Sequence, residues 1–170
     1  MSEIEIVQGD ITKMKADAIV NAANKSLLGG GGVDGAIHAA AGPQLLAECR
    51  TLHGCDTGEA KITKGYNLPA KHVIHTVGPI YRFHSPEENA KLLAACYQNS
   101  LDLAKKNNLH SIIFSSISTG VYGYPAEDAA KIAFATAKNW LADHPDYEMK
   151  ISMCAFDQRM ADIFKKEMNS

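Results

Sequence analysis

Two glycine-containing loops and one acidic turn carry the residues best suited to bind an anion or to activate water. The first loop runs from Asn21 to His38 and holds four consecutive glycines, Gly29–Gly32, followed by Asp34. A glycine run costs backbone entropy, but it lets backbone N–H groups come close to an anion at the start of a helix. We therefore interpret this segment as an anion-binding loop, with a flexible surface loop as the alternative.

The second loop spans residues 116–124 and reads Ser-Ile-Ser-Thr-Gly-Val-Tyr-Gly-Tyr, which is rich in small hydroxyl side chains. Two such loops can hold the two phosphates of a pyrophosphate from opposite sides. Neither loop contains the Gly-Lys-Ser/Thr of a P-loop. Neither shows the Gly-x-Gly-x-x-Gly pattern and later acidic residue of a Rossmann dinucleotide site. These patterns argue against a P-loop nucleotidase and against a Rossmann dinucleotide site.

The acidic turn is Gly9–Thr12, directly after the first predicted strand. A carboxylate at that place, here Asp10, can accept a hydrogen bond from an exocyclic amine. The alternative is that Asp10 is an ordinary N-cap or turn residue.

A scaffold of strands and helices must bring these three segments together. Apolar and β-branched runs predict strands at 4–8, 18–21, 60–63, 72–77, 111–115 and 149–154. Apolar residues at helical spacing predict helices near 34–41, 86–106, 125–142 and 158–168. Ser85 and Glu88 have the spacing of a capping box at the second of these helices, and Pro125 opens the third.

The alternation of strands and helices predicts a three-layer α/β/α fold around a mixed sheet, as one domain over residues 1–170. The strands at 18–21, 72–77 and 111–115 are apolar on both faces, as strands covered by helices on both sides are. Such sheets bind ligands where strands end and helices begin. The two glycine loops occupy such positions, so we expect them to form the functional site.

The composition is that of a soluble globular protein, with 170 residues, 46% hydrophobic and 21% charged. Lysine and arginine total 17 against 19 aspartate and glutamate residues, so the net charge is −2 with neutral histidines. That balance argues against a protein that grips duplex nucleic acid mainly through its phosphates. It leaves room for a local basic patch.

The four cysteines form no Cys-x-x-Cys pair, and we interpret them as free thiols of a reducing compartment. No spacing of histidines and cysteines suggests zinc, so no metal is expected. The N-terminus is too acidic for a signal peptide, and no apolar run approaches a membrane span. The expected location is the cytoplasm, with no membrane partner.

Five motifs, in order over nearly the whole chain, resemble the signature of the macrodomain family. They are Gly9–Thr12, Asn21–Asn24, Gly29–His38, His75–Pro79 and Ser118–Pro125. The likeness is greatest to the MacroD-type branch, which includes bacterial O-acetyl-ADP-ribose deacetylases and ADP-ribosyl hydrolases. The resemblance implies a macrodomain fold that binds ADP-ribose or O-acetyl-ADP-ribose without a cofactor.

In that family the ligand lies across the top of the sheet, and the resemblance implies a role for each matching residue. Asp10 would accept from the adenine amino group, and Phe156 would stack on adenine unless it packs in the core. Tyr122 would close over the distal ribose unless it is a surface side chain without a role. The implied ADP-ribose-binding residues are Asp10, Ile11, Ala23, Gly31, Gly32, Val33, Ser118, Thr119, Gly120, Val121, Tyr122 and Phe156.

The implied catalytic residues are Asp34, Asn24 and His38. Asp34 begins a predicted helix, whose positive end stabilises a carboxylate. It would accept a hydrogen bond from water or act as a general base, with a plain N-cap role as the alternative. His38 shares a helix face with Asp34 and would orient it or the substrate, unless it is a packed structural histidine. Asn24 would bind the distal ribose or brace its own loop.

The implied reaction is hydrolysis: deacetylation of O-acetyl-ADP-ribose, removal of mono-ADP-ribose from acidic side chains of proteins, or both. No cysteine lies in the loops, which argues against a thiol nucleophile. One rival is a non-catalytic module that reads ADP-ribose on other proteins. A second is a nucleic-acid or poly(ADP-ribose)-binding protein that uses a patch of Lys25, Lys61, Lys64 and Lys71.

Overall fold

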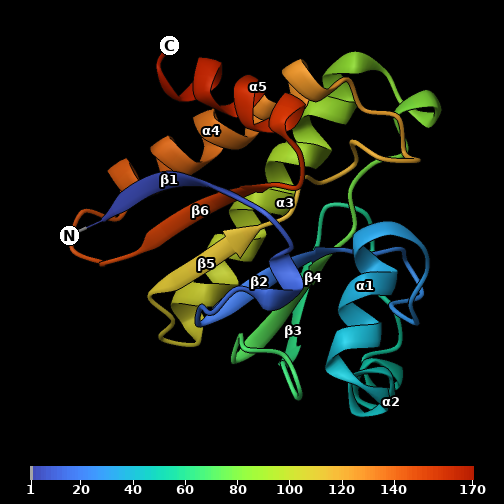
Figure 1. Cartoon of the computed structure of the whole chain (residues 1–170). Coiled ribbons are helices and arrows are strands. Elements are labelled where there is room, and N and C mark those ends of the chain that lie inside the picture. The colour runs from blue at the N-terminus through green and yellow to red at the C-terminus, as the bar shows by residue number, and fades with distance from the viewer. Residues whose placement is uncertain (1) are drawn as a thin grey trace.

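A six-stranded sheet lies between two layers of helices in the computed structural model, which describes residues 2–170 (Figure 1). The strands are β1 (Glu3–Gln8), β2 (Ala18–Ala22), β3 (Ala60–Lys64), β4 (His72–Thr76), β5 (Ser111–Phe114) and β6 (Lys150–Ala155). They are arranged in the order β1-β6-β5-β2-β4-β3. All neighbours are parallel except β3 and β4, which pair antiparallel. The predicted mixed sheet and three-layer fold are therefore confirmed.

Both faces of the sheet are covered because side chains alternate along each strand. Ala18 and Val20 of β2 join the core beneath the helices α3 (Pro86–Lys106), α4 (Ala126–Asp143) and α5 (Gln158–Met168). Ile19, between them, joins the opposite core beneath α1 (Gly32–Ala41) and α2 (Pro43–Thr51). Figure 1 shows these two helical layers on opposite sides of the sheet. Two 3-10 turns, η1 (Ile11–Lys13) and η2 (Tyr81–Phe83), complete the elements.

The structure corrects the predicted helices in four places. Helix α1 begins at Gly32 rather than at 34, and α4 begins after Pro125, which is its N-cap. Ser85 caps α3 by accepting from the backbone N–H of Glu88 at 3.1 Å, but the Glu88 carboxylate contacts the ring of His84 instead of closing the box. Helix α2 was not predicted because only Leu45 and Cys49 are buried in its nine residues.

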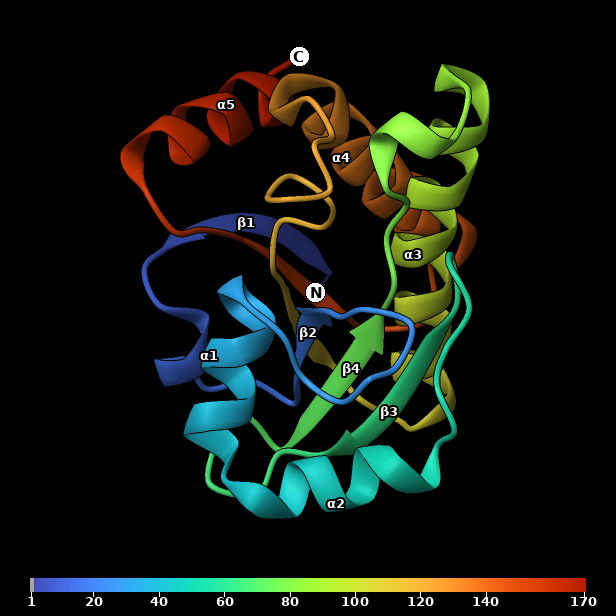
Figure 2. The same ribbon diagram turned by 90° about the vertical axis from the view of Figure 1, so that its right-hand side faces the viewer.

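The loops of interest leave the sheet at one edge. Strands β1, β6, β5 and β2 are parallel neighbours, so their carboxyl ends lie side by side. Figure 2 looks onto this edge, where the loop after β5, in orange, lies above the loop after β2, in blue. No helix within residues 2–170 is long and apolar enough to cross a membrane.

Candidate active site

The glycine loop after β2 presents a run of unused backbone donors. The N–H groups from Gly29 to Asp34 make no hydrogen bond within residues 2–170, and no side chain there caps α1 at Gly31. Gly29 and Gly32 have φ values of 93° and 58°, a backbone conformation that favours glycine. The positive end of α1 adds to these donors. This arrangement can hold an anion, as the anion-binding interpretation of the loop requires.

The loop after β5 offers a second set of donors. The backbone N–H groups of Thr119 to Tyr122 have no partner among residues 2–170. Ser118 is buried at a φ of 66° and donates its hydroxyl to the Pro79 carbonyl at 2.9 Å. A Cβ at Gly78 would collide with the Ser118 side chain, so the loop rests directly on the segment after β4. The His75–Pro79 motif thus supports this loop.

Asp10 follows β1 as the N-cap of η1. Its Oδ1 accepts from the backbone N–H and the hydroxyl of Thr12, at 2.9 and 2.7 Å. These two bonds hold the pKa of the Asp10 carboxyl below its ordinary value. The Asp10 Oδ2 and the N–H of Ile11 have no partner among residues 2–170. The N-cap role proposed as the alternative is therefore real, and it leaves a free acceptor and a free donor beside each other.

Phe156 comes directly after β6 and is 73% exposed, so it does not pack in the core. Gln8 of β1 and Ala155 of β6 are register partners, which places Phe156 beside the Gly9–Thr12 turn. An exposed aromatic ring next to an ionised carboxylate can receive a flat heterocycle that carries an amino group.

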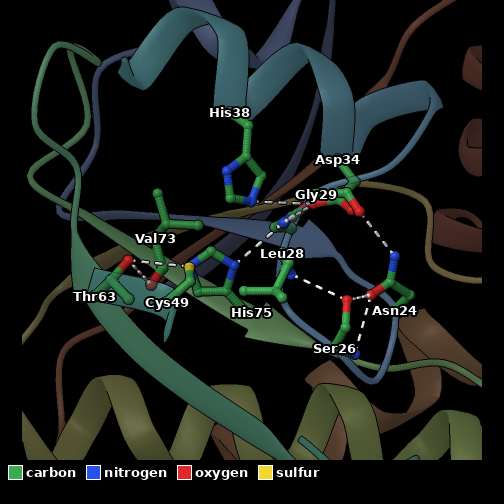
Figure 3. Close-up of polar contacts among 11 residues, drawn as sticks. Asn24, Ser26, Leu28, Gly29, Asp34, His38, Cys49, Thr63, Val73 and His75 are labelled. Carbon is green, nitrogen blue, oxygen red and sulfur yellow. Dashed lines mark hydrogen bonds and ion pairs between the residues drawn. The ribbon is translucent and has the colours of Figure 1, made fainter. Parts of the chain in front are cut away.

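Asp34 is buried in the first turn of α1, and its two carboxylate oxygens have different surroundings (Figure 3). The Oδ1 accepts from the Asn21 side-chain amide at 2.8 Å, and His38 Nε2 lies 3.6 Å away, just beyond hydrogen-bond reach. The Oδ2 has no hydrogen bond within residues 2–170 and faces Gly30, where a Cβ would lie 3.2 Å from it. The structure thus brings Asp34 and His38 together and leaves one carboxylate oxygen available to water.

Asn24 braces its own loop, which was the alternative to a ligand role. Its Oδ1 accepts from the backbone N–H of Ser26 at 3.0 Å, and its Nδ2 donates to the Gly29 carbonyl at 3.0 Å. A Cβ at Gly30 would lie 3.2 Å from the Asn24 Nδ2, the same distance as from Asp34 Oδ2. Asn24 and Asp34 therefore flank the same glycine.

Tyr122, from the loop after β5, is half-buried, and burial together with the charge of Asp34 raises its pKa. Because β5 and β2 are parallel neighbours, the loop that carries Tyr122 and the glycine loop leave the same end of the sheet.

Sequence reasoning assigned no role to Asn21 or His75, and both belong to the site. The two residues are register partners on β2 and β4, and both are fully buried. Asn21 Nδ2 lies 3.2 Å from His75 Nδ1, and His75 Nε2 lies 3.0 Å from Thr63 Oγ1 (Figure 3). Burial, with a contribution from His38, lowers the pKa of His75 to about 3. The available signal was that each of them lies in a predicted strand and opens one of the five motifs.

Other polar groups of the chain are less suited to chemistry. The cysteines are free and buried, and burial raises the pKa of the Cys49 and Cys55 thiols to about 11. No group of three or more metal-binding side chains gathers within residues 2–170. Two lysines of the basic patch are engaged elsewhere. Lys61 donates to the Leu52 carbonyl at 2.7 Å, and Lys71 lies 3.7 Å from Asp17.

Comparisons of the sequence with a family profile and with known proteins both find macro domain proteins or their relatives. The sequence profile of the Macro domain matches residues 20–133. The ADP-ribose glycohydrolase MACROD2 of Mus musculus is 59% identical over 98% of this chain and 35% of its own length. A macro domain-containing protein of Chlorobaculum tepidum is 58% identical over 97% of this chain and 95% of its own. This chain spans about a third of the MACROD2 relative.

Among solved structures, a variant of the Oceanobacillus iheyensis macrodomain with ADPR superposes with a TM-score of 0.92. It is 47% identical, and the superposition covers 98% of this chain and 91% of the other.

Proposed function

The chain belongs to the Macro domain family, and we propose that it is a hydrolase that binds ADP-ribose and cleaves groups attached to its distal ribose. Its substrates are O-acetyl-ADP-ribose, mono-ADP-ribose on acidic side chains of proteins, or both. The observation that carries this proposal is a buried carboxylate, Asp34, between two runs of unpaired backbone N–H groups. The names of the relatives, which are ADP-ribose glycohydrolases, agree with it.

The order of the strands supports one direction for the ligand. Along the edge β1-β6-β5-β2, the features are Asp10, then Phe156, then the 116–124 loop, then the glycine loop with Asp34. This is the order of adenine, pyrophosphate and distal ribose in ADP-ribose. Three strand spacings of about 4.8 Å separate β1 from β2, about 14 Å in all, which suits an extended dinucleotide-like ligand. Adenine would lie on Phe156, and the phosphates between the two loops.

Asp34 would carry the chemical step. A water that donates one hydrogen bond to Asp34 Oδ2 would attack the acetyl carbonyl carbon, and Asp34 would take up the proton as the new C–O bond forms. The bond from the carbonyl carbon to the ribose oxygen then breaks. The ribose oxygen receives that proton, and acetic acid leaves and ionises to acetate in the solvent. Asn24 and Tyr122 would hold the distal ribose, and His38 would orient the carboxylate.

The test is turnover of O-acetyl-ADP-ribose by the wild type and by Asp34→Ala, with ADP-ribose affinity measured on the same samples. We expect kcat to fall by at least about 100-fold, the size of a general-base contribution, while the affinity stays within a few-fold. Asp34→Asn is the matched control, because its side chain still accepts from Asn21 but cannot take up a proton.

Three outcomes separate the alternatives. Full activity of Asp34→Ala would remove Asp34 from the mechanism. Binding without turnover of O-acetyl-ADP-ribose or of a mono-ADP-ribosylated glutamate peptide would make the protein a reader of ADP-ribose. No binding of ADP-ribose would overturn the proposed ligand.

A further inference from the structure

A chain of hydrogen bonds runs from Asp34 into the interior of the fold. Asn21 Nδ2 lies 2.8 Å from Asp34 Oδ1 and 3.2 Å from His75 Nδ1. His75 Nε2 continues to Thr63 Oγ1 at 3.0 Å, and that hydroxyl donates to the Val73 carbonyl at 3.5 Å. Figure 3 shows His75 between Thr63 and the Asp34 end of the site. Asn21, Thr63 and His75 are all buried.

The chemistry of each group fixes the direction of the chain. An ionised carboxylate only accepts, so the Asn21 amide nitrogen donates to Asp34. Its second hydrogen points to His75 Nδ1, which must then carry a lone pair. A neutral imidazole with a lone pair on Nδ1 has its hydrogen on Nε2. That hydrogen is donated to Thr63 Oγ1.

His75 reinforces the orientation that Asp34 imposes on the Asn21 side-chain amide. The Asn21 Oδ1 is buried without a hydrogen-bond partner in residues 2–170. If the side-chain amide were rotated by 180°, its NH₂ group would take this place and would be the unsatisfied group instead. The turned amide would place Oδ1 against the Asp34 carboxylate, and the two oxygens would repel each other. An accepting nitrogen on His75 adds a second acceptor for the Asn21 NH₂ group and so keeps the donor side toward Asp34.

The surroundings of His75 keep this nitrogen free of a proton. His38 from α1 faces the ring at a centroid distance of 6.4 Å, and the Cys49 sulfur from α2 lies 3.8 Å from Nε2. Thr63 from β3 and Asn21 from β2 complete the surroundings, with Asp34 beyond Asn21. Burial, with a smaller contribution from His38, lowers the His75 pKa to about 3, so the ring is neutral at physiological pH.

We propose that His75 is a positioning residue for hydrolysis, which holds the Asn21 amide so that Asp34 Oδ1 is bound and Oδ2 faces the water. This inference rests on the hydrolase function proposed above. It gives the His75–Pro79 motif a second task, besides its support of the loop after β5.

The tautomer of His75 can be measured without any substrate. Protein labelled with ¹⁵N-histidine should show one buried neutral ring that is protonated at Nε2 and does not titrate between about pH 5 and 8. His75→Gln identifies the signal by its disappearance. A hydrogen on Nδ1, or a titration in that range, would overturn the proposal whether or not the protein is a hydrolase.

The functional test uses Thr63, which does not contact Asp34. Thr63→Val keeps the shape of the side chain but removes the acceptor for His75 Nε2–H, so the ring can adopt the other tautomer and push against Asn21. We expect kcat for O-acetyl-ADP-ribose to fall about 10- to 100-fold, the effect of a misplaced catalytic group, with ADP-ribose affinity within about twofold. Thr63→Ser, which restores the hydroxyl, should recover most of the activity.

Thr76→Val is the matched control. Thr76 is also buried, but its hydroxyl donates to the Glu59 carbonyl, which is not part of the hydrogen-bond chain from Asp34 to Val73. Wild-type kcat in folded Thr63→Val, or an equal loss of kcat in Thr76→Val, would contradict the positioning role. If the wild type itself does not turn over substrate, the proposed function fails, and the tautomer measurement still decides the structural part of the inference.

Discussion

Acid should destabilise this fold through His75 in a range where most carboxylates remain charged. The folded-state pKa of His75 is about 3, and its ordinary value is 6.5. As the pH falls below 6.5, the unfolded chain binds a proton at this residue and the folded protein does not. The contribution of His75 to stability is therefore complete above pH 6.5 and is lost progressively as the pH falls toward 3.

The size of the effect follows from the same two values. Between pH 6.5 and pH 4 the unfolded ring gains a proton over about 2.5 pH units, each of which changes the free energy of unfolding by about 1.36 kcal/mol. The expected loss is about 3 kcal/mol. This is a large part of the roughly 5–15 kcal/mol that stabilises a typical domain.

Urea unfolding of the wild type and of His75→Gln at several pH values between about 7 and 4 isolates this contribution. The free energy of unfolding of the wild type should fall toward that of the variant by about 3 kcal/mol over this range. His53→Asn, at an exposed position with a φ of 56° that asparagine tolerates, controls for the loss of one imidazole from the unfolded chain. Parallel curves for wild type and His75→Gln would refute the reasoning.

Three further substitutions test the ligand site. Phe156→Ala should weaken ADP-ribose binding by about 1–3 kcal/mol, the value of a stacked base, in a titration calorimeter, with no change in Tm because the ring is 73% exposed. Asp10→Ala should weaken ADP-ribose binding by about 1.5–3 kcal/mol but spare ribose 5-phosphate, which lacks adenine; equal losses for both ligands would make Asp10 structural only. Gly78→Ala should destabilise the fold by about 1–3 kcal/mol by overpacking against Ser118, and should also weaken ADP-ribose binding because the loop after β5 must shift. Gly120→Ala, where a Cβ meets nothing within 4 Å, should leave Tm unchanged, and an equal loss of Tm there would show that Gly78 has no special contact.

The elements that the sequence predicted well are those whose side-chain pattern is set by burial. All six predicted strands are present, with no end that differs by more than one residue. Helices α3, α4 and α5 lie within one residue of their predicted bounds, because each buries a full stripe of apolar residues. Helix α2 differs, since Gly42 and Pro43 at its start resemble a turn and its apolar stripe is short.

The sequence predicted which loops form the candidate site, but not which side chains contact one another there. Both glycine loops and the Gly9–Thr12 turn follow strands whose carboxyl ends share one edge, which the fold class alone implies. The bond from Asn21 to His75 depends on the β2–β4 pairing, which no local pattern specifies. The bracing bonds of Asn24 needed the loop conformation itself. The exposure of Phe156 decides between two roles that the sequence left open.

The hydrogen-bond chain from Asp34 through Asn21 and His75 contains no positively charged side chain, and this affects the chemistry of the carboxylate. A lysine or arginine at the place of Asn21 would hold the carboxylate as firmly, but its full positive charge would make Asp34 a weaker acceptor for a proton from water. The Asn21 amide holds the Oδ1 oxygen through a dipole alone, and neutral His75 supports that amide without adding charge. The positive end of α1 then offsets the cost of burying the carboxylate. An amide and a neutral imidazole thus keep Asp34 in place without putting a positively charged side chain beside its carboxylate.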